Sequence, residues 1–204
     1  MKQSRTGIFG GSFNPIHNGH LQLASQLRHA AQLDEVWLMV SPQNPLKQQA
    51  DLMADELRLR WARMAVEHEP HIVASDYEFH LPRPSYTWNT LQALQCDFPE
   101  RTFTLMIGGD NWHNFHQWYR ADDILRQYPI VVYPRRGSDI GPVPPGVSVV
   151  EATLMDISST EIRRRLCQGE SVSGLVPQCI EAEVVAARWC VESASVCPCE
   201  PRPR

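Results

Sequence analysis

Several features that mark large protein classes are missing from this chain of 204 residues. No apolar run approaches the 18 residues that a membrane-spanning helix needs, and the N-terminus has no hydrophobic signal region. The net charge is −4, the isoelectric point is about 6.0, and no basic stripe stands out, which argues against a general nucleic-acid binder. We therefore expect a cytoplasmic protein whose partners are small molecules, with neither nucleic acid nor a membrane among them.

The chain also lacks internal repeats and any shift in composition that would separate two domains. At this length one well-packed domain is expected, and we assign it to residues 1–190. Residues 191–204 have little to bury and are expected to form a disordered tail. Cys197 and Cys199 in that tail lack the Cys-x-x-Cys spacing of zinc or redox sites, so no metal site is predicted there. The other cysteines are spread through helical patterns and are expected to be reduced: Cys96, Cys167, Cys179 and Cys190.

The most informative segment runs from Gly10 to His20 and reads Gly-Gly-Ser-Phe-Asn-Pro-Ile-His-Asn-Gly-His. The stretch before it, residues 6–9, is short, apolar and β-branched at Ile8, as in a strand. The stretch after it carries apolar residues at helical spacing: Leu21, Ala24, Leu27 and Ala31. Glycines between a strand and a helix let backbone N–H groups approach a polyanion, and the helix N-terminus adds partial positive charge. This segment is therefore predicted to bind the phosphates of a nucleotide.

The two common nucleotide motifs, Gly-x-Gly-x-x-Gly and Gly-Lys-Ser/Thr, do not occur in this sequence. Instead the predicted helix opens with His17 and His20, and this spacing places both imidazoles on one side of the helix. Together they would donate hydrogen bonds to a phosphate and stabilise charge developing in a transition state, without accepting a proton. The alternatives are that they are capping or surface histidines, or a metal-binding pair.

A second motif, from Ile157 to Arg163, reads Ile-Ser-Ser-Thr-Glu-Ile-Arg. Ser158 and Glu161 have the spacing of a capping box, and apolar residues follow at helical period. Hydroxyls and N–H groups therefore gather beside Arg163 at a helix start. Alone this would be only a well-capped helix, but in a chain that carries the first motif it is interpreted as a second phosphate anchor.

Together the two motifs resemble those of the HxGH nucleotidylyltransferases, which bind ATP over such a turn and transfer its adenylyl group. Within that superfamily the middle of the chain is similar to the bacterial nicotinate-nucleotide adenylyltransferases, which make deamido-NAD from nicotinate mononucleotide and ATP. The similarity is carried by Ser41–Lys47 after a strand, Arg83–Thr87 before a helix, Ile107–Asp110, and Trp118 with Tyr119. With the two phosphate motifs, these segments keep the family's order over residues 6–166.

The resemblance implies roles for individual residues. His17, His20 and Arg163 would be catalytic, with the histidines on α- and β-phosphate oxygens and the arginine on the leaving pyrophosphate. Asp110 would accept a hydrogen bond from the ATP ribose. Mg²⁺ would be bound with the ATP phosphates and not by a protein carboxylate cage. The ATP site would comprise Gly10, Gly11, Ser12, Phe13, His17, His20, Gly108, Asp110, Ser158, Ser159, Thr160 and Arg163.

Nicotinate mononucleotide offers a pyridinium ring, a carboxylate and a phosphate, so its site needs an aromatic face, N–H donors and a cation. By resemblance, Trp118 stacks on the ring, backbone N–H groups near Thr87 and Tyr119 bind the carboxylate, and Lys47 lies near the phosphate. Each also has a purely structural alternative, such as core packing for Trp118 or a solvated loop charge for Lys47. The acceptor site would comprise Lys47, Ser85, Tyr86, Thr87, Trp118 and Tyr119.

The sequence shows no Ser/His/Asp or Cys/His machinery, and the predicted reaction needs none. The nucleophile is a phosphate monoester with a second pKa of about 6, so it is largely ionised at neutral pH. Catalysis would then consist of positioning and charge stabilisation during in-line attack on the α-phosphorus.

Strand-like and helix-like segments alternate along the chain, as in a parallel sheet. The fold class predicted is α/β, a Rossmann-like doubly wound parallel sheet flanked by helices, with ligands at the carboxyl ends of the strands. The strand-like runs after the first are 35–40, 71–75, 102–107, 130–133 and 147–150, and helical patterns lie at 54–67, 85–96 and 116–127.

The sequence is also compatible with other functions. A relative that uses nicotinamide mononucleotide or pantetheine phosphate would differ only in the acceptor pocket. A non-catalytic nucleotide-binding regulator would share the fold, because fold does not determine function. Arg135 and Arg136, in a Pro- and Gly-rich loop, either reach the ATP phosphates or stay solvated. A homo-oligomer is compatible with all of these readings.

Overall fold

The computed structural model describes residues 3–42, 52–135, 140–187 and 189. They form a six-stranded sheet in which every neighbouring pair is parallel, in the order β3-β2-β1-β4-β5-β6. This confirms the predicted α/β fold with a doubly wound parallel sheet. The strands are β1 (Ser4–Gly11), β2 (Glu35–Val40), β3 (Ile72–Ser75), β4 (Arg101–Gly108), β5 (Ile130–Tyr133) and β6 (Val147–Val149).

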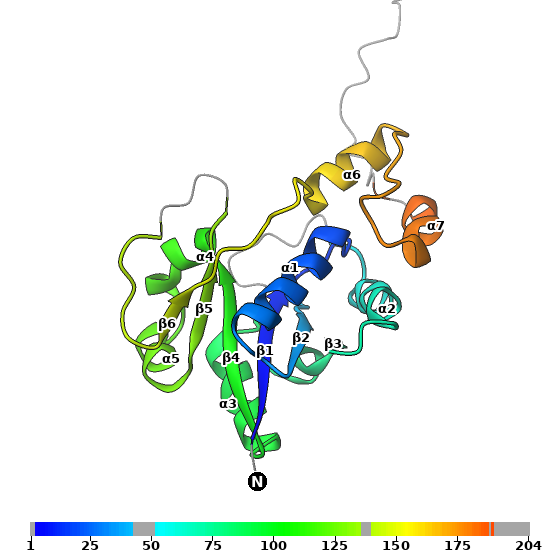
Figure 1. Cartoon of the computed structure of the whole chain (residues 1–204). Helices are drawn as coiled ribbons and strands as arrows, with labels where there is room; N and C mark the ends of the chain where they lie inside the picture. The colour runs from blue at the N-terminus through cyan, green and yellow to red at the C-terminus, as the bar shows by residue number, and fades with distance from the viewer. Residues whose placement is uncertain (1–2, 43–51, 136–139, 188, 190–204) are drawn as a thin grey trace, which may run out of the picture.

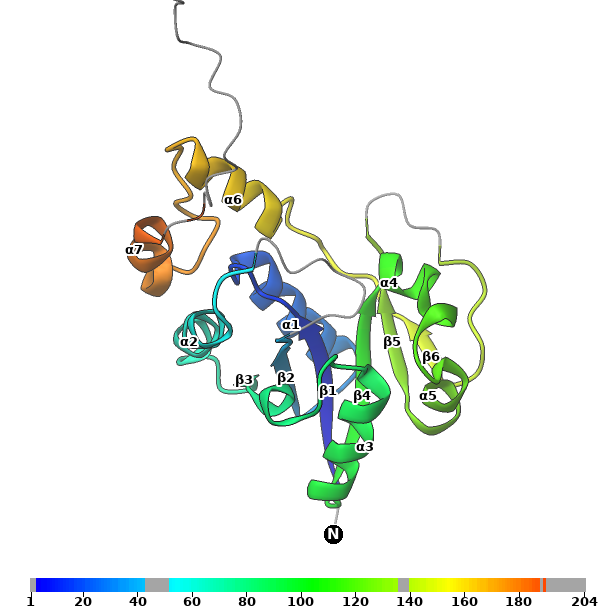
Figure 2. The same cartoon turned by 180° about the vertical axis from the view of Figure 1, so that it is seen from behind.

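Helices cover both faces of the sheet, with α1 on one face and α3 on the other (Figures 1 and 2). They are α1 (Asn18–Ala30), α2 (Asp55–Val66), α3 (Thr87–Asp97), α4 (Gly109–His113), α5 (Ala121–Gln127), α6 (Ser159–Cys167) and α7 (Gln178–Ala186), with short 3₁₀ helices η1 (Tyr77–His80) and η2 (Phe115–Gln117).

The central strand β1 supplies both hydrophobic cores, because successive side chains of a strand point to opposite faces. Phe9 is buried in the core that holds α1, α2, α6 and α7, whereas Ile8 is buried in the core that holds α3 and α5. Gly7, which precedes Ile8, is required by packing, since a Cβ there would lie 2.5 Å from the sulfur of Met106 and 2.7 Å from Leu33. Burial on both faces explains why the strands read as continuous apolar runs.

The strand order reverses between β1 and β4, and open α/β sheets bind ligands at the carboxyl ends of the strands at such a point. β1 ends at Gly11 and β4 ends at Gly108. The loop from β1 leads into α1, and α4 follows β4 directly. Figure 1 shows α6 beside this same edge of the sheet. The fold therefore brings both predicted phosphate motifs to one edge.

The sequence predicts a single helix over residues 116–127, but the structure breaks it into η2 and α5. Arg120 has a left-handed backbone with φ of 56°, which a right-handed helix cannot include. The break places Trp118 and Tyr119 between the two helices, where their side chains are not committed to a helix face.

The cysteines are in part free thiols, as the sequence predicts. Cys96 and Cys179 are free. Cys167 is disulfide-bonded, so the expectation of a reduced thiol is wrong there, because sequence spacing does not show which cysteines meet in space. The predicted tail, 191–204, lies outside the described residues. Within the part of the chain that the structure describes, no helix is long and apolar enough to cross a membrane.

Candidate active site

The loop between β1 and α1 is anchored at the edge of the sheet by buried side chains. Phe13 adopts a left-handed backbone with φ of 45° and is buried, and Ile16 is completely buried. The Asn14 side chain accepts a hydrogen bond from the Met53 N–H at 3.1 Å. A Cβ on Gly10 would meet no atom within 4 Å. The loop thus packs its large side chains inward and leaves the glycine side open to a ligand.

His17 and His20 lie together at the N-terminus of α1, as their spacing predicts. Their rings stack with centroids 3.6 Å apart at 23°. The His17 backbone N–H donates to Nδ1 of His20 at 3.3 Å, which places the proton of a neutral His20 on Nε2. Phe13 packs edge-on against His20 at 5.0 Å. These contacts orient His20 so that the atom able to donate to a phosphate is Nε2.

His17 is the N-cap residue of α1 and is only 5% exposed. Burial, and secondarily the charge of Arg135, lower the pKa of His17 to about 4. The ring is therefore neutral at pH 7 and acts as a hydrogen-bond donor and acceptor, not as a cation. Its Nδ1 is buried without a hydrogen-bond partner among the described residues, and such a group is costly unless a ligand or water satisfies it.

The second phosphate motif docks directly on the first loop. Ser159 donates from Oγ to the Pro15 carbonyl at 3.0 Å, and Arg163 donates from Nη1 to the Asn14 carbonyl at 2.9 Å. Ser158 caps α6 as its spacing predicts, because its Oγ accepts from the Glu161 N–H at 3.1 Å. These bonds bring the two motifs into contact across the chain.

The Glu161 side chain takes a different role from the one that the capping-box spacing predicts. It pairs with Arg164 and Arg165, each at 2.8 Å, and these two guanidinium groups lower the pKa of Glu161 to about 2. Of the three consecutive arginines, Arg163 is therefore the one directed at the first loop.

Asp110 lies in the first turn of α4, close to Arg135 after β5. Nη1 of Arg135 lies 3.3 Å from Oδ2 of Asp110, and the Arg135 guanidinium lies over the Tyr133 ring at 5.8 Å. Gly108 permits this arrangement, because a Cβ there would lie 2.5 Å from the Asp110 carboxylate and 3.0 Å from Arg135. Arg135 thus contacts a predicted ATP-site residue, whereas Arg136 lies outside the described residues, so a contact of either arginine with the ATP phosphates stays a prediction.

The two predicted acceptor segments that the structure describes meet at Tyr86 and Tyr119. Tyr86 and Tyr119 are in ring contact at 5.0 Å, and Tyr119 is 51% exposed. Tyr86 is the N-cap of α3 and provides no side-chain cap. The first N–H groups of α3, beginning at Thr87, therefore keep the anion-binding capacity of an uncapped helix start. Lys47 lies outside the described residues, so its predicted contact with the acceptor stays a prediction.

Trp118 is half-buried beside these segments. Its ring packs on Phe115 at 5.3 Å, tilted by 43°, and its Nε1 is buried without a hydrogen-bond partner among the described residues. The Ser85 Oγ is also buried, and it lies close enough to Glu78 to lower the pKa of that carboxyl. In the predicted acceptor segments, Nε1 of Trp118 is thus left without a hydrogen-bond partner among the described residues.

Two buried charged residues beside the predicted ligand segments were missed from the sequence. Arg58 in α2 is completely buried and binds the backbone carbonyls of Ser12 and Ser41. Glu78 in η1 is also buried and accepts from Ser41 at 2.7 Å and Thr90 at 2.9 Å. Burial raises its pKa, and the hydroxyls of Ser41, Thr90 and Ser85 oppose the shift. In the sequence, the position of Arg58 between two leucines of a helical pattern is a signal that it is buried, and no such signal marks Glu78.

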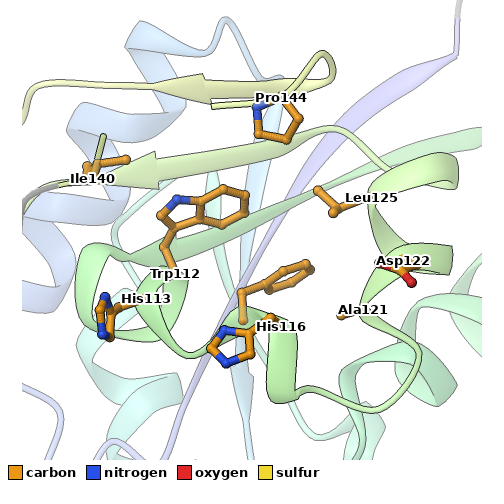
Figure 3. A pocket seen from close by; sticks show the side chains of 9 residues that line it. Trp112, His113, His116, Ala121, Asp122, Leu125, Ile140 and Pro144 are labelled. Carbon is orange, nitrogen blue, oxygen red and sulfur yellow. The ribbon is translucent and has the colours of Figure 1, made fainter. Parts of the chain in front are cut away.

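A pocket of about 380 Å³ is lined by none of the residues assigned to either substrate, although Phe115 in its wall packs on Trp118. The Trp112 indole points across it toward Leu125 (Figure 3). Its lining contains His113 and His116 but neither the stacked histidines nor the second phosphate motif: Trp112, His113, Phe115, His116, Ala121, Asp122, Leu125, Ile140 and Pro144. The chemistry assigned here lies at the carboxyl ends of β1 and β4 and not in this pocket.

Comparison with known proteins agrees with the sequence and the fold. Residues 8–165 match the cytidylyltransferase-like family. A probable nicotinate-nucleotide adenylyltransferase of Bacteroides fragilis is 45% identical over 199 residues, covering 97% of this chain and 99% of the relative. One from Bacteroides thetaiotaomicron is 49% identical over 170 residues, covering 82% and 84%.

Solved structures share the fold at lower identity. The Plasmodium falciparum nicotinic acid mononucleotide adenylyltransferase complexed with NaAD superposes with a TM-score of 0.73 at 16% identity, covering 90% of this chain and 95% of that one. A putative nicotinate-nucleotide adenylyltransferase from Vibrio parahaemolyticus gives 0.67 at 23% identity, covering 89% and 99%.

Proposed function

The chain belongs to the nicotinate-nucleotide adenylyltransferases of the cytidylyltransferase-like family, and we propose how its own residues carry out their reaction. The enzyme transfers the adenylyl group of ATP to nicotinate mononucleotide and yields deamido-NAD and pyrophosphate, a step of NAD biosynthesis. The observation that carries our assignment of residues is the stacked His17–His20 pair at 3.6 Å, with Arg163 anchored on the same loop.

An oxygen of the nicotinate mononucleotide phosphate attacks the α-phosphorus of ATP in line. A new bond forms between that oxygen and the α-phosphorus, and the bond from the α-phosphorus to the bridging oxygen of the β-phosphate breaks. The attacking phosphate is largely ionised at neutral pH, since its second pKa is about 6, so no general base is needed. The protein's contribution is to position both substrates and to stabilise charge on the transferred group.

His20 is the donor to the transferring phosphate in this proposal. Its Nδ1 already accepts from the His17 N–H, so its Nε2 proton is directed at an α-phosphate oxygen. His17 donates as a neutral ring, consistent with its lowered pKa of about 4. Neutral donors held in place need no reorganisation when charge develops in the transition state.

Arg163 and the start of α6 hold the leaving pyrophosphate. Ser158, Ser159 and Thr160 supply hydroxyls and N–H groups at a helix N-terminus, where anions are favoured. Asp110 accepts from the ATP ribose, and its two carboxylate oxygens allow this while Oδ2 stays 3.3 Å from Arg135. Gly10 and Gly11 at the end of β1, with Ser12 and Phe13, cradle the phosphates.

The acceptor lies between the α3 start and Trp118. The uncapped N–H groups at Thr87, with the backbone at Tyr119, bind the nicotinate carboxylate, and Trp118 stacks on the pyridinium ring. Ser85 and Tyr86 line this site, and the family resemblance predicts that Lys47 contacts the acceptor phosphate. N–H donors around a carboxylate disfavour an amide, because the amide NH₂ would face donors and leave groups unpaired.

We also propose that Mg²⁺ accompanies ATP. Enzymes that transfer nucleotidyl groups generally use a divalent metal, and Mg²⁺ in such sites is held through substrate phosphates and water. The residues gathered around the phosphate loop are imidazole, hydroxyl and guanidinium donors, which fit phosphate oxygens and not a dedicated cation cage. A cytoplasmic location and assembly into a homo-oligomer stay predictions.

The position of bond cleavage tests this chemistry directly. With nicotinate mononucleotide carrying ¹⁸O in its phosphate, mass spectrometry is expected to find all of the label in deamido-NAD and none in pyrophosphate. Label in pyrophosphate would mean attack on a different phosphorus and would refute the assigned mechanism.

A further inference from the structure

Arg58 is the point where the two substrate loops are joined. The side chain is completely buried in α2. It donates from Nη1 to the Ser12 carbonyl in the ATP loop and from Nη2 to the Ser41 carbonyl after β2 at 3.1 Å. Nε donates to the Met53 carbonyl at 3.0 Å. The guanidinium therefore holds the backbone of the ATP loop to the segment that follows β2.

An ion-pair chain connects Arg58 to the acceptor segment. Nη2 of Arg58 lies 2.6 Å from Oδ1 of Asp55, and the other oxygen of the same carboxylate lies 2.9 Å from Nη2 of Arg83. Arg83 precedes the acceptor residues Ser85 to Thr87 by two positions. The Asp55 carboxylate is thus shared between a buried arginine on the ATP side and a half-exposed arginine on the acceptor side.

A second connection runs through hydroxyl groups. Ser41, whose carbonyl binds Arg58, donates from Oγ to Glu78 at 2.7 Å. Glu78 accepts from the Thr90 hydroxyl at 2.9 Å, and the Thr90 backbone N–H donates to the Tyr86 carbonyl at 3.1 Å. The acceptor segment therefore reaches Arg58 by two independent sets of hydrogen bonds.

This arrangement is more than is needed to fill the core. An apolar side chain would occupy the same space without the cost of taking a charge out of water. Arginine provides five donors in a fixed fork, and at Arg58 these donors are used on carbonyl groups of two separate ligand loops. One side chain is therefore tied to the backbone of both loops through charge-assisted hydrogen bonds.

We propose that Arg58 is a positioning residue that couples acceptor binding to ATP binding, through Asp55 and Arg83 and through Ser41, Glu78 and Thr90. The inference deepens the proposed function and rests on it. When the acceptor orders the segment around Tyr86, the ATP loop loses less freedom on binding its own ligand, so ATP binds more tightly. The coupling is reciprocal, and ATP tightens the acceptor by the same factor.

Calorimetry with the unreactive α,β-methylene analogue of ATP measures this coupling in the full chain. The quantity is the ratio of the analogue's Kd without and with saturating nicotinate mononucleotide. For the wild type we expect a ratio of about fivefold or more, the lower range of allosteric coupling. In Arg83→Gln/Thr90→Val, which cuts both connections, we expect a ratio below about twofold.

Arg63→Gln is the matched control. Arg63 lies on α2 like Arg58, is half-exposed like Arg83, and has its own 2.9 Å ion pair, with Asp76 outside the network. It is expected to keep the wild-type ratio. A purely structural role for the network would change thermal stability but leave the ratio intact. Arg83→Gln alone alters a half-exposed side chain, should fold, and is expected to lose part of the ratio.

A wild-type ratio of one overturns the proposal, and so does full retention of the ratio in Arg83→Gln or in the double variant. Failure of the underlying function looks different. In that case nicotinate mononucleotide would neither bind the wild-type protein nor support turnover with ATP, whereas failure of the coupling alone leaves both intact.

Discussion

The neutral state of His17 makes a quantitative prediction about stability and pH. The pKa of His17 is lowered from 6.5 to about 4 in the folded protein, mainly by burial. Between these two values the unfolded chain binds a proton that the folded chain does not, so the free energy of unfolding falls as the pH falls from 6.5 toward 4. Well above pH 6.5 the ring is neutral in both the folded and the unfolded state, so it no longer changes the free energy of unfolding with pH.

The magnitude follows from the width of that window. From 6.5 down to pH 5 the loss is about 2 kcal/mol, at about 1.4 kcal/mol per pH unit, and it reaches about 3 kcal/mol near pH 4. The assay is urea unfolding of the wild type and of His17→Gln at pH 8 and at pH 5. Other histidines contribute equally to both proteins, so the wild type should lose about 2 kcal/mol more than the variant. If the wild type and His17→Gln lost the same free energy of unfolding between pH 8 and pH 5, a buried, neutral His17 would be refuted.

Three further substitutions test separate parts of the site by steady-state kinetics. His20→Ala is expected to lower kcat about 100-fold or more with little change in the acceptor KM, because the lost donor acts on the transition state; a raised acceptor KM with kcat intact would contradict this role. Trp118→Ala is expected to raise the acceptor KM about tenfold with kcat largely kept, and an unchanged KM would make the ring a packing residue only. Arg163→Lys is expected to raise the ATP KM about tenfold, because one ammonium cannot both hold the Asn14 carbonyl and bind phosphate in a fork; wild-type ATP KM would remove Arg163 from the phosphate site.

Local patterns in the sequence predicted much of the fold. The strands were recognisable because buried parallel strands read as apolar runs, and β2 and β5 begin and end where the pattern places them. Ser158 was recognisable as the cap of α6 because capping depends on a spacing of three residues. The stacked histidines follow from the same kind of short-range geometry.

The sequence could not indicate which residues form hydrogen bonds and ion pairs with one another when the contact depends on the tertiary fold. Nothing in the pattern indicates that Arg58 would bind Ser12 and Ser41, because those contacts depend on where α2 packs. The break in the predicted 116–127 helix likewise depends on one left-handed residue, Arg120. The ion pair between Asp110 and Arg135 joins two strand ends whose adjacency only the sheet order determines.

Pyrophosphate release tests the central claim most directly. Wild-type protein with ATP and Mg²⁺ would receive nicotinate mononucleotide, nicotinamide mononucleotide or phosphopantetheine in parallel at equal concentration. The account predicts release mainly with nicotinate mononucleotide, because N–H donors at the α3 start and Tyr119 select a carboxylate over an amide. Preferential release with either other acceptor would contradict the assignment of the acceptor pocket. If folded protein that binds ATP released no pyrophosphate with any of the three acceptors, the proposed adenylyl transfer itself would be contradicted.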